Sequence, residues 1–174
     1  MKQILEEIET MYNGTTGINS YIDKLTETFY NKNKIIGIGA GRMGYSLRSH
    51  IMRLSQIGYS CWFIGDTTLP RIDEESIVVI NTSTGETETN ILYAEQAKNH
   101  GSFLIVITCN KFSTIGKMAD MLVELPVINS FQVMKTIYEQ FTWLLLDYAI
   151  DETIKNIERS DFRKKIQYNH SVLE

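Results

Sequence analysis

The fold is decided by residues 35–44, which read IIGIGAGRMG. The first half is a short apolar run rich in β-branched isoleucine, typical of a buried strand, and Gly39, Gly41 and Gly44 then have the GxGxxG spacing. Glycines let the backbone approach an anion, and the helix expected after them supplies unpaired N–H groups and a positive dipole end. The stretch therefore predicts a strand, an anion-binding turn and a helix in succession.

Four further short apolar runs follow, and they read SCWFIG at 60–65, SIVVIN at 76–81, SFLIVIT at 102–108 and DMLVEL at 120–125. The segments between them are long enough for helices, which is typical of a buried parallel sheet with crossover helices. We therefore expect an α/β fold with a doubly wound, five-stranded parallel sheet flanked by helices. The length of 174 residues suits one ordinary core, so residues 1–174 are expected to form a single domain.

Helical patterns flank the predicted sheet. Apolar residues recur at helical spacing over 4–11 and 18–29, and Gly14 and Gly17 mark the break between the two N-terminal helices. A long C-terminal helix from about 130 to about 158 is apolar almost all round. Such a helix must be buried against the sheet and between subunits, so we expect a homodimer or homotetramer.

Composition excludes several classes of protein. The net charge is −4 and Lys and Arg are scattered, which argues against a nucleic-acid surface. The acidic start is no signal peptide, and no stretch reaches the roughly 18 apolar residues of a membrane span. Two cysteines, Cys61 and Cys109, make no disulfide framework and suit reduced thiols in a cytosol. We therefore expect a cytoplasmic protein with no membrane partner. No metal is expected either, because His, Cys and carboxylate residues show no ligand spacing.

A second candidate anion site follows the third apolar run. Residues 82–87 read TSTGET and carry four hydroxyls directly before another predicted helix. Capping that helix would need one hydroxyl, whereas a phosphomonoester has three acceptor oxygens and binds many short donors. The GxGxxG motif and Asp66, about twenty residues on, would also fit a dinucleotide-binding oxidoreductase. That site needs no hydroxyl-rich turn, so a phosphate is favoured and the oxidoreductase remains an alternative.

The pairing of GAGRMG with NTSTGET resembles the sugar isomerase (SIS) domain family, whose members bind phosphosugars through such a turn. MRLSQIGY, DTTLPRI, GKMAD, FQVMKTIYEQ and the terminal NHSVLE make residues 34–174 similar to the 6-phospho-3-hexuloisomerases within it. The resemblance implies a cofactor-free isomerase that interconverts a 3-hexulose 6-phosphate and fructose 6-phosphate through an enediol. A non-catalytic phosphosugar-sensing module is the alternative.

The resemblance also implies which residues bind the substrate. The substrate phosphate would be held by the hydroxyls and backbone of Thr82, Ser83, Thr84, Gly85 and Thr87. Gly39, Gly41 and Arg42 would contact the substrate, although Arg42 could equally be a surface helix residue. Met43 stands where the family usually has Ser, and the segment 126–130 is shorter than the family's loop. The resemblance therefore extends further for the phosphate site than for the identity of the sugar.

Two catalytic residues are implied in the same way. Glu139 would be the proton-transferring base, since an apolar helix raises the basicity of a carboxylate; a structural ion pair with Lys135 is the alternative. His170, offered by a neighbouring subunit, would transfer protons to sugar oxygens or open a cyclic form. His50 and His100 are expected on helix surfaces.

Overall fold

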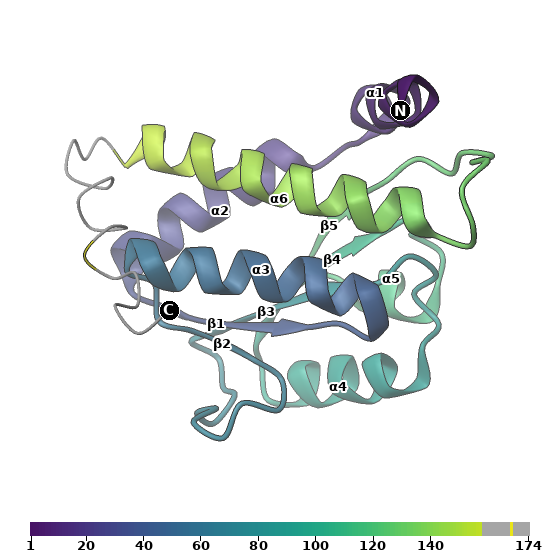
Figure 1. The fold of residues 1–174 in the computed structure, drawn as a ribbon. Helices are drawn as coiled ribbons and strands as arrows, with labels where there is room; N and C mark the ends of the chain where they lie inside the picture. The colour runs from purple at the N-terminus through teal and green to yellow at the C-terminus, as the bar shows by residue number, and fades with distance from the viewer. Residues whose placement is uncertain (158–167, 169–174) are drawn as a thin grey trace.

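The computed structural model describes residues 1–157 and Tyr168. Its centre is a five-stranded parallel sheet with the strand order β2-β1-β3-β4-β5 (Figure 1). The strands are β1 (Lys34–Ile38), β2 (Cys61–Phe63), β3 (Ser76–Asn81), β4 (Phe103–Thr108) and β5 (Met121–Glu124). Each of them coincides with one of the five apolar runs, with β1 beginning one residue before its run, so the predicted fold class is confirmed.

Helices cover both faces of this sheet. On one face α2 (Ile18–Asn31), α3 (Gly41–Ile57) and α6 (Thr136–Asn156) pack over Ile35, Ile77, Val79, Ile105 and Ile107 (Figure 1). On the other, α4 (Glu88–Asn99) and α5 (Thr114–Met118) pack over Ile36, Ile38, Val78, Ile80, Leu104 and Val106. Because alternate side chains are buried on opposite faces, the central strands are apolar throughout.

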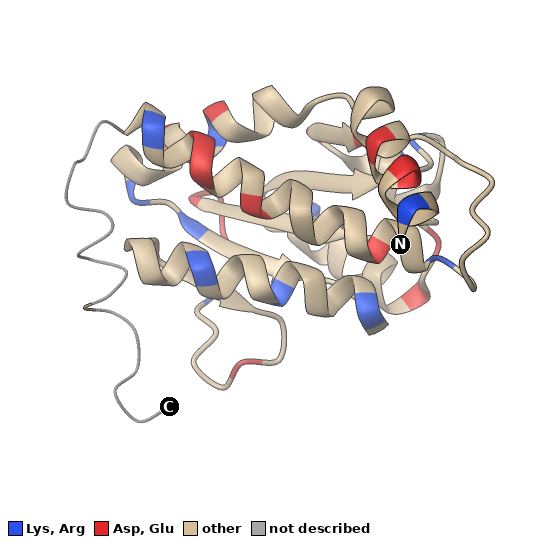
Figure 2. Cartoon of the chain, turned by 45° about the horizontal axis from the view of Figure 1, so that its top comes forward, with Lys and Arg blue, Asp and Glu red and all other residues tan. Residues whose placement is uncertain are grey.

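Opposite charges line two neighbouring helices (Figure 2). Arg42 and Arg53 lie on α3, and α6 beside it carries Glu139 and Asp147. Arg42 pairs with Glu139, and the charge of Arg53 acts on Asp147. These two arginines of α3 therefore face carboxylates of α6, whereas Arg48 of the same helix pairs with Asp66. In the described part of the chain, no helix is both long and apolar enough to cross a bilayer.

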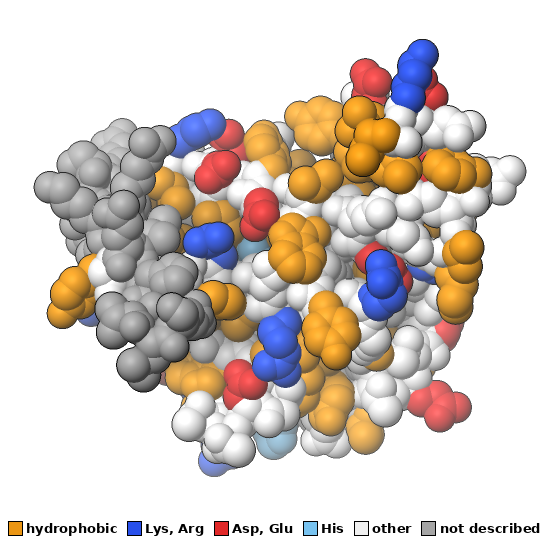
Figure 3. Space-filling model, viewed as in Figure 1, with side chains coloured by type: hydrophobic (Ala, Val, Ile, Leu, Met, Phe, Trp, Pro, Cys, Tyr) orange, Lys and Arg blue, Asp and Glu red, His pale blue; other side chains and the backbone are white. Residues whose placement is uncertain are grey.

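The first helix, α1 (Lys2–Gly14), lies against α6 rather than on the sheet (Figure 1). The Tyr12 and Tyr148 rings meet edge to face with centroids 6.4 Å apart. Exposed apolar side chains gather where α1 meets α6, at the upper right of Figure 3. The predicted break before α2 is confirmed: Gly17 has φ +82°, and a Cβ there would lie 2.1 Å from the Leu122 carbonyl oxygen.

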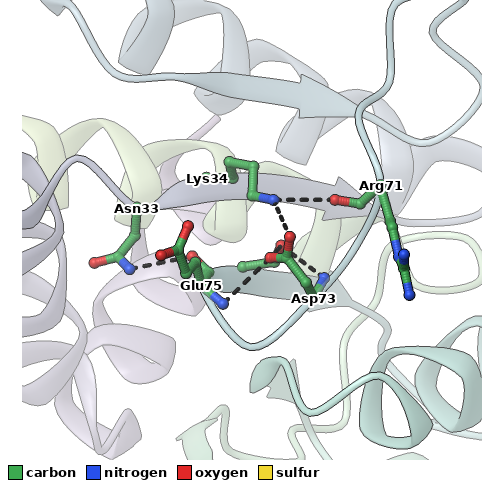
Figure 4. Close-up of polar contacts among 6 residues, drawn as sticks. Asn33, Lys34, Arg71, Asp73 and Glu75 are labelled. Atoms are coloured by element: carbon green, nitrogen blue, oxygen red, sulfur yellow. Dashed lines mark hydrogen bonds and ion pairs between the residues drawn. The ribbon is translucent and has the colours of Figure 1, made fainter.

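The connection between β2 and β3 departs from the expected crossover helix, because residues 64–75 form none. Polar contacts fix its path (Figure 4). Lys34 Nζ donates to the Arg71 carbonyl at 3.1 Å and pairs with Asp73 at 2.6 Å. Asn33 Nδ2 donates to the Glu75 carbonyl at 3.1 Å. The start of β1 thus holds the end of this connection.

The long C-terminal helix begins later than predicted, at Thr136 instead of about residue 130. Glu7 of α1 holds the preceding segment by accepting hydrogen bonds of 2.9–3.0 Å from Ser130, Phe131 and Gln132. Met134 then has φ +56°, which a helix cannot contain. The predicted end near Glu158 lies outside the described residues.

The prediction that His50 lies on a helix surface is wrong. Its side chain is 1% exposed, and its Nε2 lies 2.7 Å from the hydroxyl of Tyr21, which joins α3 to α2. Burial lowers the pKa of His50 to about 3, so the ring is neutral. His50 follows Met43 and Leu47 on the buried face of α3, and that spacing would have placed it correctly. His100, just after α4, is exposed as predicted.

Candidate active site

The two predicted anion-binding loops meet at the carboxyl ends of β1 and β3. From β1 the chain continues to β2 on one side, and then returns to β3 on the other side of β1. In a parallel sheet this switch point opens a crevice where ligands bind. Gly39 follows β1 and packs close to Asn81 at the end of β3, since a Cβ on Gly39 would lie 3.3 Å from the Asn81 carbonyl oxygen.

The glycine loop after β1 is shaped by close backbone packing. A Cβ on Gly44 would lie 2.4 Å from the Gly39 carbonyl oxygen, so the start of α3 touches the end of β1. Gly41, with φ +55°, makes the turn between them. Ala40 precedes α3, and no described side chain caps the helix. The first N–H groups of α3 therefore remain available to a ligand.

The hydroxyl-rich turn after β3 is instead shaped by hydrogen bonds. The Ser83 carbonyl accepts from the Cys109 N–H at 3.2 Å, at the end of β4. Gly85 has φ +70°, and a Cβ there would lie 2.0 Å from Ser113 Oγ. Thr82 is buried, and its Oγ1 accepts from the Gly85 N–H at 3.2 Å. The Thr82 hydroxyl therefore also helps to shape the turn.

The remaining hydroxyls of this turn are more open. Thr84 is exposed, and Ser83 and Thr87 are half-buried. Thr87 directly precedes α4, yet its side chain makes no capping hydrogen bond to the described residues. No hydrogen bond of this kind therefore supports the interpretation that Thr87 caps α4. Glu86 points its carboxylate at the start of α5, where the Thr114 backbone N–H donates at 2.9 Å and lowers the pKa of Glu86.

Glu139 pairs with Arg42 across the helices α6 and α3, so the predicted alternative pairing with Lys135 does not form. Lys135 Nζ lies instead 5.1 Å from the centroid of the Tyr138 ring. The Glu139 side chain is 16% exposed, whereas that of Arg42 is 67% exposed. Both line a cavity of about 210 Å³, together with Tyr45, Ser46, Gln140 and Trp143.

Sequence reasoning missed part of this site. It did not identify Tyr45, Gln140 and Trp143, nor the buried Ser46 and Thr142 behind them. A hydroxyl residue on an otherwise apolar helix face was the available signal for the last two. His170 lies outside the described residues.

Asp66, the acidic residue of the dinucleotide alternative, is bonded within the protein. One carboxylate oxygen of Asp66 accepts from the Phe63 N–H at 2.8 Å, and the other pairs with Arg48 at 3.2 Å. Asp66 thus closes the turn after β2. Among the described residues, no group of three or more His, Cys, Asp and Glu is placed to hold a metal ion.

The chain is similar to known proteins. The SIS domain family matches residues 28–146. The 3-hexulose-6-phosphate isomerase of Methanocaldococcus jannaschii is 31% identical over 147 residues, which cover 83% of this chain and 81% of the relative. That of Bacillus subtilis is 27% identical, covering 96% of this chain and 94% of the relative.

The fold of the chain is also similar to the folds of solved structures. A Methanococcus jannaschii protein, whose structure infers a molecular function of 3-hexulose-6-phosphate isomerase, has a TM-score of 0.84 at 28% identity, covering 99% of this chain and 96% of that one. The Vibrio vulnificus NanR protein, complexed with ManNAc-6P, shares the fold at 14% identity and a TM-score of 0.76, covering 96% of this chain and 64% of that one. With its sheet, its two loops and a family match across most of its length, the chain belongs to the SIS domain family.

Proposed function

We propose that the chain is a phosphosugar isomerase that interconverts a 3-hexulose 6-phosphate and fructose 6-phosphate without a cofactor. The observation that carries the proposal is Glu139: a mostly buried carboxylate, paired with Arg42, on the wall of a cavity beside the switch point. The isomerases of M. jannaschii and B. subtilis, similar to this chain over most of its length, support this substrate class.

The reaction needs a single well-placed base. The base removes a proton from the carbon that bears the neighbouring hydroxyl while the carbonyl oxygen gains a proton, and an enediol forms. The base then returns a proton to the former carbonyl carbon while the neighbouring hydroxyl loses its proton and becomes the new carbonyl. Glu139 performs both transfers if it reaches both carbons. Arg42 holds the carboxylate in place, and its exposed guanidinium stabilises negative charge that develops on the sugar oxygens.

The phosphate is held at the hydroxyl-rich turn. Ser83, Thr84 and Thr87 offer hydroxyls there, and the start of α4 adds N–H groups that no described side chain caps. A Cβ on Gly41 would meet nothing within 4 Å, so the sugar can approach the backbone of the glycine loop closely there, beside Gly39. Binding at the phosphate end thereby orients the reacting carbons toward Glu139.

We also propose that the active sites are shared between subunits of a homodimer or homotetramer. An apolar cavity of about 370 Å³ lies between α1 and α6, lined by Leu5, Ile8, Glu9, Tyr12, Phe141, Leu144, Leu145 and Tyr148. Leu5 is 58% and Leu144 50% exposed there, an apolar surface that a second copy of the chain would bury (Figure 3). Such packing would let His170 reach a neighbouring site.

A coupled assay tests the function by following fructose 6-phosphate formation from the 3-hexulose 6-phosphate. The proposal expects saturable turnover by the parent protein. Saturable phosphosugar binding with no turnover of any ketose or aldose phosphate would instead make the chain a sensing module. Enhanced NADH fluorescence on titration would support the alternative that the chain is an oxidoreductase.

Subunit mixing tests the shared site. Glu139→Gln and His170→Ala proteins are combined under conditions that let subunits exchange. Recovered activity supports a site built from two chains, and no recovery assigns each site to one chain. A monomeric mass at micromolar concentration would exclude sharing directly.

A further inference from the structure

A buried row of polar side chains joins the two loops to the helix that carries Glu139. Asn81, at the end of β3, donates from Nδ2 to Ser46 Oγ on α3 at 2.9 Å. Ser46 Oγ lies 3.1 Å from Thr142 Oγ1 on α6. Thr142 Oγ1 in turn donates to the Glu139 carbonyl at 3.2 Å. We name Asn81, Ser46 and Thr142 the polar bridge.

The donors at both ends of the polar bridge have defined acceptors. The second hydrogen of Asn81 Nδ2 bonds the Met43 carbonyl at 3.0 Å, which also fixes the orientation of the amide because a flipped oxygen would face that carbonyl. Ser46 Oγ also lies 2.9 Å from the Met43 carbonyl of its own helix, so its single hydrogen goes either to that carbonyl or to Thr142, whereas Thr142 donates to the Glu139 carbonyl. The bridge thus ends on the backbone of the proposed base, one turn before Thr142 on α6.

The polar bridge is as buried as the apolar core around it. The side chains of Asn81 and Thr142 are 0% exposed and that of Ser46 is 2% exposed. Asn81 Oδ1 has no partner among the described residues, which is an unfavourable arrangement for a buried acceptor. Apolar residues of the same shape would fill this place without that penalty. Stability alone therefore does not account for the bridge, whereas a buried polar network does fix one relative arrangement of the elements it joins.

The place of the polar bridge fits a role in the reaction. Asn81 directly precedes the hydroxyl-rich turn, Met43 and Ser46 follow the glycine loop, and Thr142 shares the first turns of α6 with Glu139. Ser46 also lines the cavity that Glu139 and Arg42 open into. The bridge therefore connects the phosphate end of the site to the proton-transferring end through bonds of fixed geometry.

We propose that Asn81, Ser46 and Thr142 are positioning residues that set Glu139 relative to the bound phosphosugar. The inference rests on the proposed function and deepens it by adding these residues to the isomerase site. Asn81 and Thr142 are fully buried and Ser46 is 2% exposed, so their loss should lower kcat and leave KM for the phosphosugar nearly unchanged.

The test uses Thr142→Val, which keeps the β-branched shape and removes the hydroxyl, with Thr153→Val as the matched control. Thr153 is also a fully buried threonine of α6, and its hydroxyl bonds the Ala149 carbonyl of the same helix at 2.7 Å. We expect Thr142→Val to lower kcat about tenfold with KM within twofold of the parent, since small misplacements of a base reduce the rate strongly. Thr153→Val should keep the parental kcat, and Thr142→Ser, which restores the hydroxyl, should recover most of the loss.

Amide hydrogen exchange of residues 136–142 gives a readout that needs no turnover. Thr142→Val should speed exchange there in the free protein, and Thr153→Val should not. Ser46→Ala, which removes the central hydroxyl, provides a second variant if Thr142→Val folds poorly. Parental kcat or parental exchange in the bridge variants, or an equal effect of Thr153→Val, overturns the inference. A parent protein without turnover defeats the proposed function instead, and exchange alone then decides whether the bridge holds the first turn of α6.

Discussion

The two loops at the switch point reach neighbouring positions by opposite means. The glycine loop after β1 depends on missing side chains, because Gly39 and Gly44 touch through their backbones. The turn after β3 depends on polar groups, which bond to one another and to the end of β4. A side chain at Gly39 or Gly44 must therefore disturb the packing of α3, whereas we expect the loss of an exposed hydroxyl in the second loop to remove a proposed phosphate contact and to leave the fold intact.

The largest expected effect is at Glu139, the proposed base. Glu139→Gln keeps the size of the side chain but cannot accept a proton, so isomerisation should fall by about 10²–10⁴-fold. Exchange of the substrate's carbon-bound proton with solvent should cease, as followed by NMR in D₂O. Phosphosugar binding should persist, because the loops are unchanged. Parental exchange would transfer the role of base to His170.

As the pH falls, the group on α3, the helix after the glycine loop, should lose its contribution to stability before the group in the turn after β3 does. Burial lowers the pKa of His50 on α3 to about 3 from a usual 6.5. Stability from the neutral ring is thus fully present above pH 6.5 and is lost as the pH falls toward 3, by up to about 1.4 kcal/mol per pH unit. The lowered pKa of Glu86 in the turn adds stability that is lost only below its usual 4.5.

Urea unfolding at a series of pH values checks this order. The free energy of unfolding should decline between pH 6.5 and 4.5 in the parent, and His50→Gln should flatten that decline. Glu86→Gln should alter the profile only at lower pH. A parent whose stability is constant from pH 6.5 to 4.5 would contradict the assignment to His50.

Gly44→Ala tests the packing side of the comparison. The new Cβ would lie 2.4 Å from the Gly39 carbonyl oxygen, so α3 must move away from β1. We expect a loss of up to about 3 kcal/mol of unfolding free energy together with weaker phosphosugar binding. Ser49→Ala, at a half-buried position on the same helix, should leave both nearly unchanged. A stable Gly44→Ala protein would show that the close approach is dispensable.

Thr84→Val tests the hydrogen-bonding side and has the smallest expected effect. Affinity for inorganic phosphate and fructose 6-phosphate, measured by calorimetry, should fall by about 1–2 kcal/mol with no change in melting temperature. Thr10→Val is the control, because Thr10 is an exposed threonine whose hydroxyl bonds the Glu6 carbonyl of its own helix. Parental phosphate affinity in Thr84→Val would move the anchor to the glycine loop.

The sequence predicted the elements whose pattern is local. The strands follow from short β-branched runs, and the break between α1 and α2 follows from Gly14 and Gly17. The start of α6 could not be predicted, because it depends on Glu7 more than a hundred residues away. The burial of His50 was predictable from its spacing with Met43 and Leu47, but its hydrogen-bond partner Tyr21 lies on another helix and was not.

The candidate site also contains residues that a local sequence pattern predicts and residues that it does not. The turn residues were recognisable because they are contiguous in the sequence, from Thr82 to Thr87. The pairing of Arg42 with Glu139 and the polar bridge join residues 35 to 97 positions apart. Such partners become neighbours only when the sheet has set the order of its strands, and no local pattern encodes them.

The contacts of Glu7 bear on the order in which the protein is made. Glu7 leaves the ribosome early, yet its partners Ser130, Phe131 and Gln132 follow 123 to 125 residues later. Contacts of such separation close late in folding, since a long loop must be ordered first. A nascent chain that already holds all five strands therefore still lacks a fixed start for α6. The candidate site on α6 can therefore be fixed only after the residues of all five strands have been made.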